Sequence, residues 1–397
     1  RQDYVRKSRA VESRTLEVVV NISQSRREFL QYGTLLLART AFAQSVAAGR
    51  VTTVVGTGAR GVALEGDAPD HTQLNNPFHM VIGPDGAMYF SDFGTSRVLR
   101  WDFRTSRLSI VAGTGTKGFS GDGGPAKSAQ LSAPHEVRFD SKGNLYIDER
   151  DNHIVRRVDM KSGIISTVAG TPGKNGYGGD GGPATKALFN QPHGITLDRS
   201  DNLYICDPLN NRLRRVDAKT GIITTFAGNG KDDRAPDEGA FTGTPLPGPR
   251  SLEITRNGKW YLALREGNSI FLLDPGKSRL KRVAGNGDSG YSGDGGPALA
   301  ARFGSLGAGG LTGPKGLIIS DDGGTMYVAD CENHVIRKIN LRNGIISTLI
   351  GTGQRGDGPD GDPAQCKLSR PHAVCIHGRT LYVADSENNR IRALAIS

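Results

Sequence analysis

Residues 192–228 read PHGITLDRSDNLYICDPLNNRLRRVDAKTGIITTFAG. Four apolar runs of about five to seven residues lie within this stretch, and each is bounded by Gly, Asp or Asn, which tight turns prefer. The runs fall at 194–198, 202–207, 212–217 and 222–228. This pattern predicts four short strands joined by turns.

The same pattern recurs six times along the chain. Aligned on the proline that opens each copy, the copies begin at Pro77, Pro134, Pro192, Pro249, Pro314 and Pro371. The second run of every copy carries a tyrosine, at Tyr89, Tyr146, Tyr204, Tyr261, Tyr327 and Tyr382. One four-stranded sheet cannot bury both of its faces, but a ring of such sheets can. The repeat therefore predicts an all-β, six-bladed β-propeller over residues 49–397.

The sixth copy, from His372 to Ser397, supplies only three of its four runs. A run that matches the missing one lies at the other end of the repeat region, because GRVTTVVGT at 49–57 resembles GIISTVAG at 163–170. We predict that this N-terminal strand completes the last blade and closes the ring, which removes its open edge. The region is then one domain, although the length of the chain would allow two.

Residues 1–43 precede the repeats and have a different character. Residues 25–30 read SRREFL, an apolar LLLA stretch follows, and the small-residue site AFA ends at Ala43. The order of these parts resembles a bacterial twin-arginine export signal, preceded by an N-terminal extension. Gln31 and Arg39 depart from that pattern, and a basic tail is the alternative interpretation. An export signal predicts a periplasmic or extracellular protein.

Composition and charge exclude several classes of protein. No run of about 18 apolar residues occurs, so we expect no conventional membrane span. Four cysteines in 397 residues exclude a disulfide-rich scaffold. The net charge is +10, and loss of residues 1–43, which hold eight basic and four acidic residues, leaves +6. We expect no nucleic-acid partner, because export separates the protein from RNA.

Arginines concentrate in the third run of most copies. We expect them to form salt bridges between blades and a solvated rim. These basic residues are Arg156, Arg157, Arg212, Arg214, Arg215, Arg337, Lys338, Arg390 and Arg392.

The residue after each repeat proline is expected to face the mouth of the central channel. In chain order these residues are Phe78, His135, His193, Arg250, Lys315 and His372. Two cations and three imidazoles in one place favour an anionic ligand, such as a carboxylate or an acidic sugar. Asp148 and Glu149, at the end of the second run of the second copy, form an unusual acidic pair. We add both to the candidate ligand-binding residues.

Other acidic residues recur at equivalent positions. The second runs of five copies end in Asp92, Glu149, Asp207, Asp330 and Asp385. Three loops between copies read GDGGPA and contain Asp122, Asp180 and Asp294. Recurrence at so many positions favours hydrogen bonds that hold turns, rather than acid–base pairs or calcium sites. The fourth copy ends its second run in Leu264 and lacks the GDGG loop, so it has drifted or acquired a feature of its own.

Three segments closely resemble the repeats of bacterial NHL-repeat proteins. They are NLYI at 144–147, NLYICD at 202–207 and YVADSENNRI at 382–391. The resemblance covers residues 49–397 and implies a six-bladed propeller. This family includes binding platforms, sensor domains and a few metal-dependent enzymes, so the resemblance implies no single activity.

One relative in that family, the peptidyl-hydroxyglycine amidating lyase, has Pro-His elements on alternate blades whose histidines bind zinc. The corresponding residues here are His135, Arg250 and His372, so the resemblance carries a metal-ligating role to His135 and His372 alone. The alternative function is therefore a metal-dependent lyase or hydrolase, either amidating-lyase-like or lactonase-like. It would hold a divalent metal, zinc or calcium, in the central channel.

Our leading hypothesis is an exported, monomeric propeller that acts as a binding module at its channel mouth. Its partner would be a protein, or an anionic small molecule or glycan, and whether the protein is also an enzyme stays open. Cys331 and Cys366 fall in predicted loops on the mouth face, and a disulfide between them is left open. Cys206 and Cys375 fall within predicted strands and are expected to be small buried residues.

Overall fold

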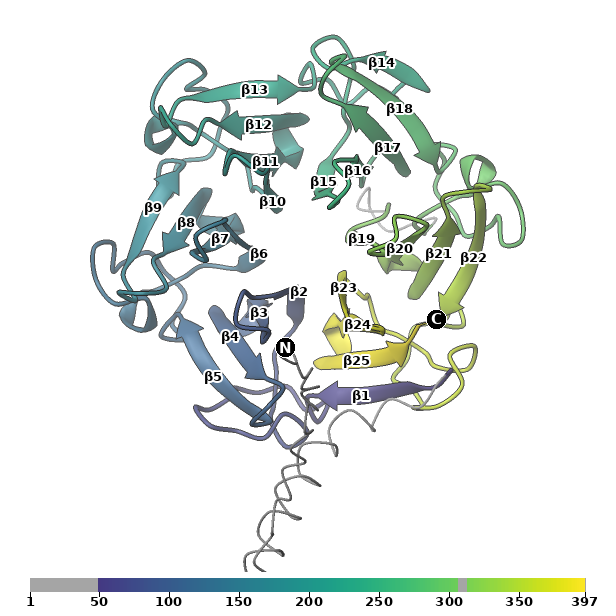
Figure 1. Cartoon of the computed structure of the whole chain (residues 1–397), viewed down its shortest axis with the longest axis horizontal. Helices are drawn as coiled ribbons and strands as arrows, with labels where there is room; N and C mark the ends of the chain where they lie inside the picture. Colours follow the sequence, from purple (N-terminus) through teal and green to yellow (C-terminus); the bar gives the residue numbers. More distant parts are fainter. Residues whose placement is uncertain (1–48, 306–312, 397) are drawn as a thin grey trace, which may run out of the picture. The chain divides into compact units, whose positions relative to one another are not determined.

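The computed structural model describes residues 49–305 and 313–396, so the predicted export signal lies outside the described residues. Six antiparallel sheets surround a central axis, and one edge strand of each sheet faces that axis (Figure 1). Apart from short 3-10 helices, the described residues form strands and turns. The predicted all-β, six-bladed propeller is confirmed.

The first three blades have four strands each, joined in sequence order. Blade 1 contains β2 (Pro77–Ile82), β3 (Met88–Asp92), β4 (Arg97–Asp102) and β5 (Arg107–Ala112). Blade 2 contains β6 (Pro134–Phe139), β7 (Leu145–Glu149), β8 (Ile154–Val158) and β9 (Ile165–Ala169). Blade 3 contains β10 (Gly194–Leu197), β11 (Leu203–Asp207), β12 (Arg212–Val216) and β13 (Ile223–Ala227).

The other three blades show two variations on this plan. Blade 4 has five strands, β14 (Glu238–Ala240), β15 (Pro249–Ile254), β16 (Trp260–Leu264), β17 (Ser269–Asp274) and β18 (Arg279–Ala284). Blade 5 contains β19 (Leu317–Ile319), β20 (Thr325–Asp330), β21 (Val335–Asn340) and β22 (Ile345–Ile350). Blade 6 contains β23 (Ala373–His377), β24 (Thr380–Asp385), β25 (Arg390–Ala395) and β1 (Val51–Val55).

Short 3-10 helices occur at two repeated places. Five follow the second strand of a blade, η1 (Phe93–Thr95), η3 (Arg150–Asn152), η5 (Pro208–Asn210), η7 (Cys331–Asn333) and η8 (Ser386–Asn388). The other three follow the GDGGP loops, η2 (Ala126–Ser128), η4 (Ala184–Lys186) and η6 (Ala298–Ala300). The first group turns the chain back from the second strand into the third.

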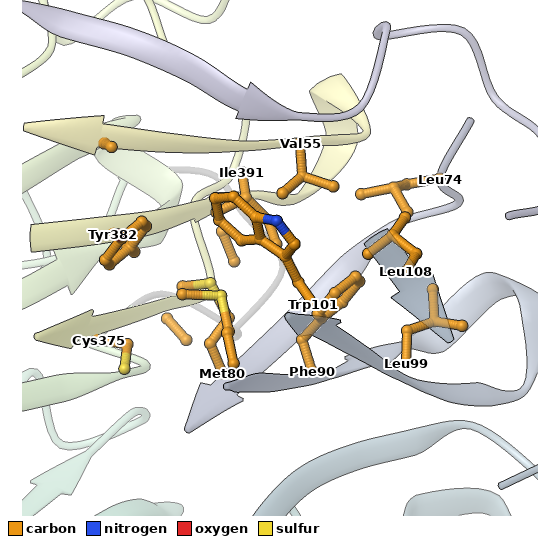
Figure 2. Packing of buried hydrophobic residues seen from close by; sticks show 14 of the residues in the cluster. Val55, Leu74, Met80, Phe90, Leu99, Trp101, Leu108, Cys375, Tyr382 and Ile391 are labelled. Atoms are coloured by element: carbon orange, nitrogen blue, oxygen red, sulfur yellow. The ribbon is translucent and has the colours of Figure 1, made fainter. Parts of the chain in front are cut away.

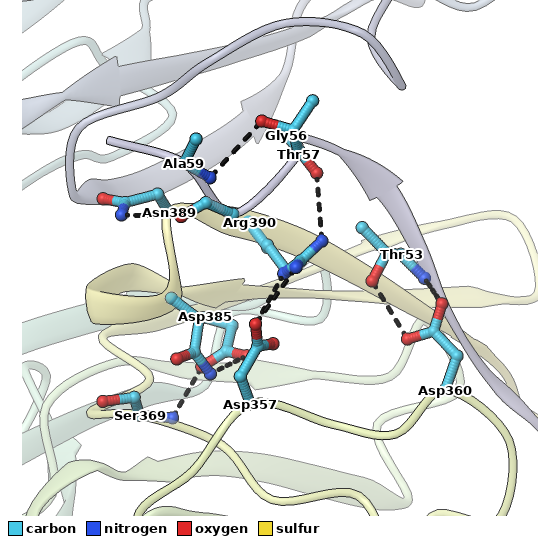
Figure 3. A network of polar contacts seen from close by, with 12 residues as sticks. Thr53, Gly56, Thr57, Ala59, Asp357, Asp360, Ser369, Asp385, Asn389 and Arg390 are labelled. Atoms are coloured by element: carbon cyan, nitrogen blue, oxygen red, sulfur yellow. Dashed lines mark hydrogen bonds and ion pairs between the residues drawn. The ribbon is translucent and has the colours of Figure 1, made fainter. Parts of the chain in front are cut away.

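Blade 6 takes its outermost strand from the N-terminal side of the propeller. β1 pairs with β25 in antiparallel register, with Val55 opposite Ile391. Asp360 holds β1 from the neighbouring loop, since its Oδ2 accepts the Thr53 N–H at 2.7 Å and its Oδ1 accepts the Thr53 hydroxyl at 2.9 Å (Figure 3). The strand is therefore fixed through its backbone and through a side chain.

The hydrophobic core lies between neighbouring blades. Between blades 6 and 1, the Trp101 side chain is buried against Phe90, Met80 and Val55 (Figure 2). The ring of Tyr382 from blade 6 meets the Trp101 ring edge-on, with their centroids 6.1 Å apart. Each blade thus buries its faces against its neighbours, which fixes the inner strands around the channel.

Four arginines of the third strands are buried, so the prediction of a solvated rim is wrong for them. They are at most 2% exposed, and they are Arg156, Arg214, Arg337 and Arg392. Arg156 is typical, because its Nη2 donates to Asp122 at 2.6 Å and its Nη1 lies 3.5 Å from the Glu149 Oε1. The Phe119 ring covers the guanidinium at 5.2 Å. Asp122 thus ties its GDGG loop to the blade, as the structural interpretation predicted.

Blade 4 differs from the others at its outer edge. In place of a GDGG loop, its incoming segment forms β14, which pairs antiparallel with β18. The feature that sets this copy apart in the sequence is therefore a fifth strand. Among the described residues, the four cysteines are free and buried, so no disulfide joins Cys331 to Cys366. Cys206 and Cys375 are buried as predicted.

Candidate functional site

The residues that follow the repeat prolines converge on one cavity, which we call the mouth cavity. It has a volume of about 330 Å³. Its lining includes all six predicted channel-mouth residues, Phe78, His135, His193, Arg250, Lys315 and His372. The rest of the lining is Asn76, Phe93, Arg150, Gln191, Leu209, Arg265 and Arg370.

Local backbone geometry explains why these positions converge. In five blades, the residue directly before the repeat proline has a positive φ, and these residues are Asn76, Ala133, Gln191, Gly248 and Arg370. This left-handed conformation turns the incoming chain sharply. The proline then starts or precedes the inner strand, and the following side chain is 2–7% exposed in all six blades. The repeat therefore places six buried side chains at one level of the channel.

Arg250 is the least compensated cation of this cavity. Its Nη1 donates to the His193 carbonyl at 3.2 Å, and its Nη2 lies 3.4 Å from the His135 Nε2. Within the described residues, no carboxylate forms an ion pair with it, although the Glu136 charge acts on it from farther away, and its Nε has no hydrogen-bond partner. Burial lowers the pKa of Arg250 to about 10, so the guanidinium stays charged at neutral pH.

The other cations of the mouth cavity have carboxylate partners. The Lys315 Nζ donates to Glu332 at 2.6 Å, and Arg370 shares the same carboxylate at 2.8 Å. Arg265 pairs with Glu266, and Arg150 pairs with Asp151. These carboxylates lie outside the lining, so positive groups face the cavity while the compensating charges sit behind them.

The three histidines are neutral at physiological pH. Burial, with nearby cations adding to it, lowers the pKa of His135, His193 and His372 well below the usual value. The His193 Nδ1 lies 2.6 Å from the Gln191 carbonyl, which can only accept, so Nδ1 carries the proton. Its Nε2 then accepts from the Arg265 Nη1 at 3.3 Å.

These donors do not suit a divalent metal. The His135 Nε2 lone pair faces the Arg250 guanidinium, which places a positive charge where zinc or calcium would bind. The His372 Nε2 lies 3.9 Å from the Cys331 Sγ. In the part of the chain that the structure describes, no group of three or more His, Cys, Asp or Glu side chains could hold a metal ion. The residues present therefore do not fit the metal centre of the alternative hypothesis.

One wall of the mouth cavity is aromatic. The Phe78 ring lies between the His372 ring, at a centroid distance of 3.9 Å, and the Phe93 ring, at 4.4 Å. Both pairs are close to parallel, at 22° and 16°. The Arg150 guanidinium lies 5.0 Å from the Phe93 centroid, so it caps the stack as a cation–π contact.

Asp148 and Glu149 do not line the mouth cavity. The Glu149 Oε2 accepts the Ser132 N–H at 2.9 Å and the Asn152 amide at 2.6 Å, which holds the turn after β7. The other acids at second-strand ends accept equivalent bonds, as predicted, and they are Asp92, Asp207, Asp330 and Asp385. Asp148 is fully buried, and neither carboxylate oxygen has a hydrogen-bond partner among the described residues.

A second group of charged side chains, the second charged layer, comes from the inner strands β2, β6 and β15 and does not line the mouth cavity. The Arg138 Nη2 lies 2.8 Å from the Glu136 Oε1 and 3.1 Å from the Glu253 Oε2, so it links blade 2 to blade 4. The His79 Nε2 is 3.3 Å from the Glu136 Oε1. Burial raises the pKa of Glu136 to about 7. It raises the pKa of Asp148 well above its usual value, with the Glu136 charge adding to the effect.

Sequence reasoning missed Phe93, Arg150 and Arg265, which line the mouth cavity. All three occupy one repeat position, directly after the last residue of the second strand. The repeat alignment could have identified these residues, because each one directly follows the residue that ends a second strand. The Arg138 link was not predictable, because its partner lies 115 residues away on another blade.

Comparison with known proteins supports an NHL-repeat propeller. A family model described as NHL repeat matches residues 368–394. The chain is 30% identical over 300 residues to the Arabidopsis thaliana protein SUPPRESSOR OF QUENCHING 1, chloroplastic, in a match covering 72% of this chain and 27% of that protein. It is 23% identical over 342 residues to Bos taurus NHL repeat-containing protein 2, covering 76% of this chain and 45% of the relative. The chain thus spans about a quarter to a half of the length of these relatives.

Solved structures share the fold. An auxiliary nutrient binding protein from Bacteroides thetaiotaomicron superposes with a TM-score of 0.63 at 18% identity, covering 87% of this chain and 75% of that chain. A protein with the same description from Bacteroides ovatus gives 0.63 at 16% identity, covering 87% and 76%. At these identities the likeness concerns the fold alone. The curated relatives named above come from a plant and an animal, so the bacterial origin stays a prediction.

Proposed function

We propose that this NHL-repeat propeller is a binding module that holds one small anionic ligand in its mouth cavity. Ligand pockets typically have volumes of about 300–1,000 Å³, so a cavity at the lower end of that range suits one small molecule. No acidic side chain is among the described residues that line it, whereas five are Arg or Lys, namely Arg150, Arg250, Lys315, Arg265 and Arg370. A carboxylate is the simplest group that complements this lining.

The observation that carries the proposal is the state of Arg250. A buried charge without a partner is costly, and a protein usually pairs it or neutralises it. Arg250 keeps its charge and has only neutral contacts, the His193 carbonyl and the His135 ring. An anion that enters the cavity would supply the missing partner through a charge-assisted hydrogen bond.

Binding is better supported than metal-dependent catalysis. A lyase or hydrolase of the alternative kind would need His135 and His372 as ligands, and the Arg250 guanidinium lies against the His135 Nε2, which leaves only Nδ1 of that ring to coordinate. The histidines instead act as neutral neighbours that orient two guanidiniums, those of Arg250 and Arg265.

We also propose that the protein is exported and meets its ligand outside the cytoplasm. The twin-arginine-like signal within residues 1–43 favours export to the periplasm or beyond, where small acids and acidic sugars are available to a binding protein. Nutrient-binding proteins share this fold, which is compatible with such a role. Within the described residues, no helix is long and apolar enough to cross a membrane.

A thermal-shift experiment on the full chain tests the proposal. A ligand that binds only the folded state raises the melting temperature, and at equal concentration the tighter ligand gives the larger shift. We expect benzoate to raise the melting temperature more than the neutral isostere benzamide, at matched ionic strength. The variant Arg250→Gln should lose this difference, whereas Arg256→Gln, an exposed arginine of the same blade, should keep it. Equal shifts for benzoate and benzamide in the wild-type protein would overturn the proposal.

A further inference from the structure

The mouth cavity has two chemically different sides. Phe78 and Phe93 come from blade 1, whereas Arg250 and Arg265 come from blade 4. In a ring of six blades these two blades face each other, and β2 and β15 lie on opposite sides of the channel in Figure 1. A ligand that fills the cavity therefore meets the two phenylalanines on the blade 1 side and the Arg250 and Arg265 guanidiniums on the blade 4 side. The other lining cations, Arg150, Lys315 and Arg370, come from the blades between them.

The aromatic wall has no free ring face on Phe78, and the His135 ring already meets part of the Phe78 edge, at a centroid distance of 4.8 Å and an angle of 70°, so a ligand can meet only the rest of the ring edges. Phe78 has one face against His372 and the other against Phe93, and the outer face of Phe93 carries the Arg150 guanidinium. The edge of an aromatic ring carries the positive part of its quadrupole, and it prefers to meet the negative face of another ring. Leu209, with 47% of its surface exposed, adds an apolar group from blade 3, beside the blade that carries Arg250 and Arg265.

The lining also lacks the groups that other anionic ligands need. Apart from the charged and ring side chains, the described lining residues provide two amides, Asn76 and Gln191, and no hydroxyl or carboxylate. The hydroxyl oxygens of an acidic sugar could accept from the cations, but its O–H groups would find few acceptors in this lining, and buried donors without partners are costly. The ammonium group of an amino acid would face cations with no carboxylate to pair with it.

We propose that the ligand is an aromatic carboxylate without an ammonium group. Its carboxylate pairs with Arg250 and its ring packs against the edges of Phe78 and Phe93. This inference rests on the proposed function, and it selects one chemical class among the anions that the cavity could take.

Isothermal titration of the full chain with four acids tests this inference. The probes are phenylacetate, cyclohexylacetate, glucuronate and phenylalanine, at one pH and ionic strength. We expect phenylacetate to bind roughly 2- to 10-fold more tightly than cyclohexylacetate, because edge-to-face contacts add to apolar burial. We expect glucuronate and phenylalanine to bind at least about tenfold more weakly than phenylacetate.

Matched variants locate the aromatic preference. Phe93→Leu should weaken phenylacetate binding about 2- to 10-fold and leave cyclohexylacetate nearly unchanged. Phe93 is half-buried, so this variant keeps the fold more securely than a change at buried Phe78. The control Phe119→Leu changes an exposed phenylalanine outside the mouth cavity and should alter neither affinity.

The outcomes separate the two proposals. Glucuronate or phenylalanine binding as tightly as phenylacetate, or a Phe93→Leu variant with an unchanged preference, would overturn the aromatic inference and leave anion binding intact. No binding of any of the four acids would overturn the proposed function itself.

Discussion

Asp148 is a buried carboxyl group that forms no hydrogen bond among the described residues. Equivalent positions in the other blades carry small or weakly polar side chains, Ser91, Cys206, Ala263, Ala329 and Ala384. The charges that act on Asp148 come from Glu136, Glu149, Arg250 and Arg150, and burial dominates, so its pKa lies well above the usual value. The folded state therefore retains a proton here that the unfolded state releases above about pH 4.

Asp148→Ala should stabilise the protein at neutral pH. Because the folded pKa is raised, the part of the cost that is linked to ionisation increases as the pH rises above about 4 and disappears below that pH. We expect the free energy of unfolding to increase by about 1–3 kcal/mol at pH 7.5, with a smaller gain at pH 4. Urea unfolding at both pH values measures this. The exposed control Asp70→Ala should show no gain, and a variant that is less stable than wild type at pH 7.5 would contradict the account.

At the scale of elements, the inner strand β6 joins the two charged layers. It carries His135 at the mouth cavity, then Glu136 and Arg138, which make the ion pairs of the second layer. The Glu136 charge acts on Arg250, and the other charged or titratable groups around Glu136 are His79, Arg138, Glu253 and Asp148. The protonation of one residue on β6 can therefore change the field at the cation that we propose binds the ligand.

This arrangement predicts that ligand affinity depends on pH. Burial raises the pKa of Glu136 to about 7, so Glu136 gains negative charge as the pH rises through 7. Arg250, with a pKa of about 10, and the ligand carboxylate keep their charges over this range. We expect the affinity for phenylacetate to fall roughly 3- to 10-fold between pH 6 and pH 8.

Titration calorimetry on wild type and Glu136→Gln checks this dependence. Glutamine cannot ionise, so the affinity of the variant should stay flat between pH 6 and pH 8. The mouth histidines contribute no slope there, because burial keeps their pKa values well below the usual range. A variant with the same slope as the wild-type protein would show that another group titrates.

At the scale of the whole molecule, the repeat made the fold predictable. Each copy carries its own turn residues and strand pattern, so six weak local signals reinforce one another. The same alignment placed Phe78, His135, His193, Arg250, Lys315 and His372 at one level, and the structure brings them together.

The pairing of cations with carboxylates around the mouth cavity was harder to predict from the sequence. Whether a cation is compensated depends on side chains from distant segments, as when Lys315 meets Glu332 while Arg250 meets no carboxylate among the described residues. The burial of Arg156 escaped prediction for a related reason. Its partner Asp122 lies 34 residues away in a loop, and a charged strand residue usually indicates a solvated face.

The central claim is that Arg250 receives the anion of a ligand in the mouth cavity. The most direct measurement is a crystal structure of the full chain grown with phenylacetate. The account predicts the carboxylate within hydrogen-bond distance, roughly 2.7–3.2 Å, of the Arg250 guanidinium, with the ring toward Phe78 and Phe93. Phenylacetate bound elsewhere on the propeller, with the mouth cavity free of it, would contradict the claim.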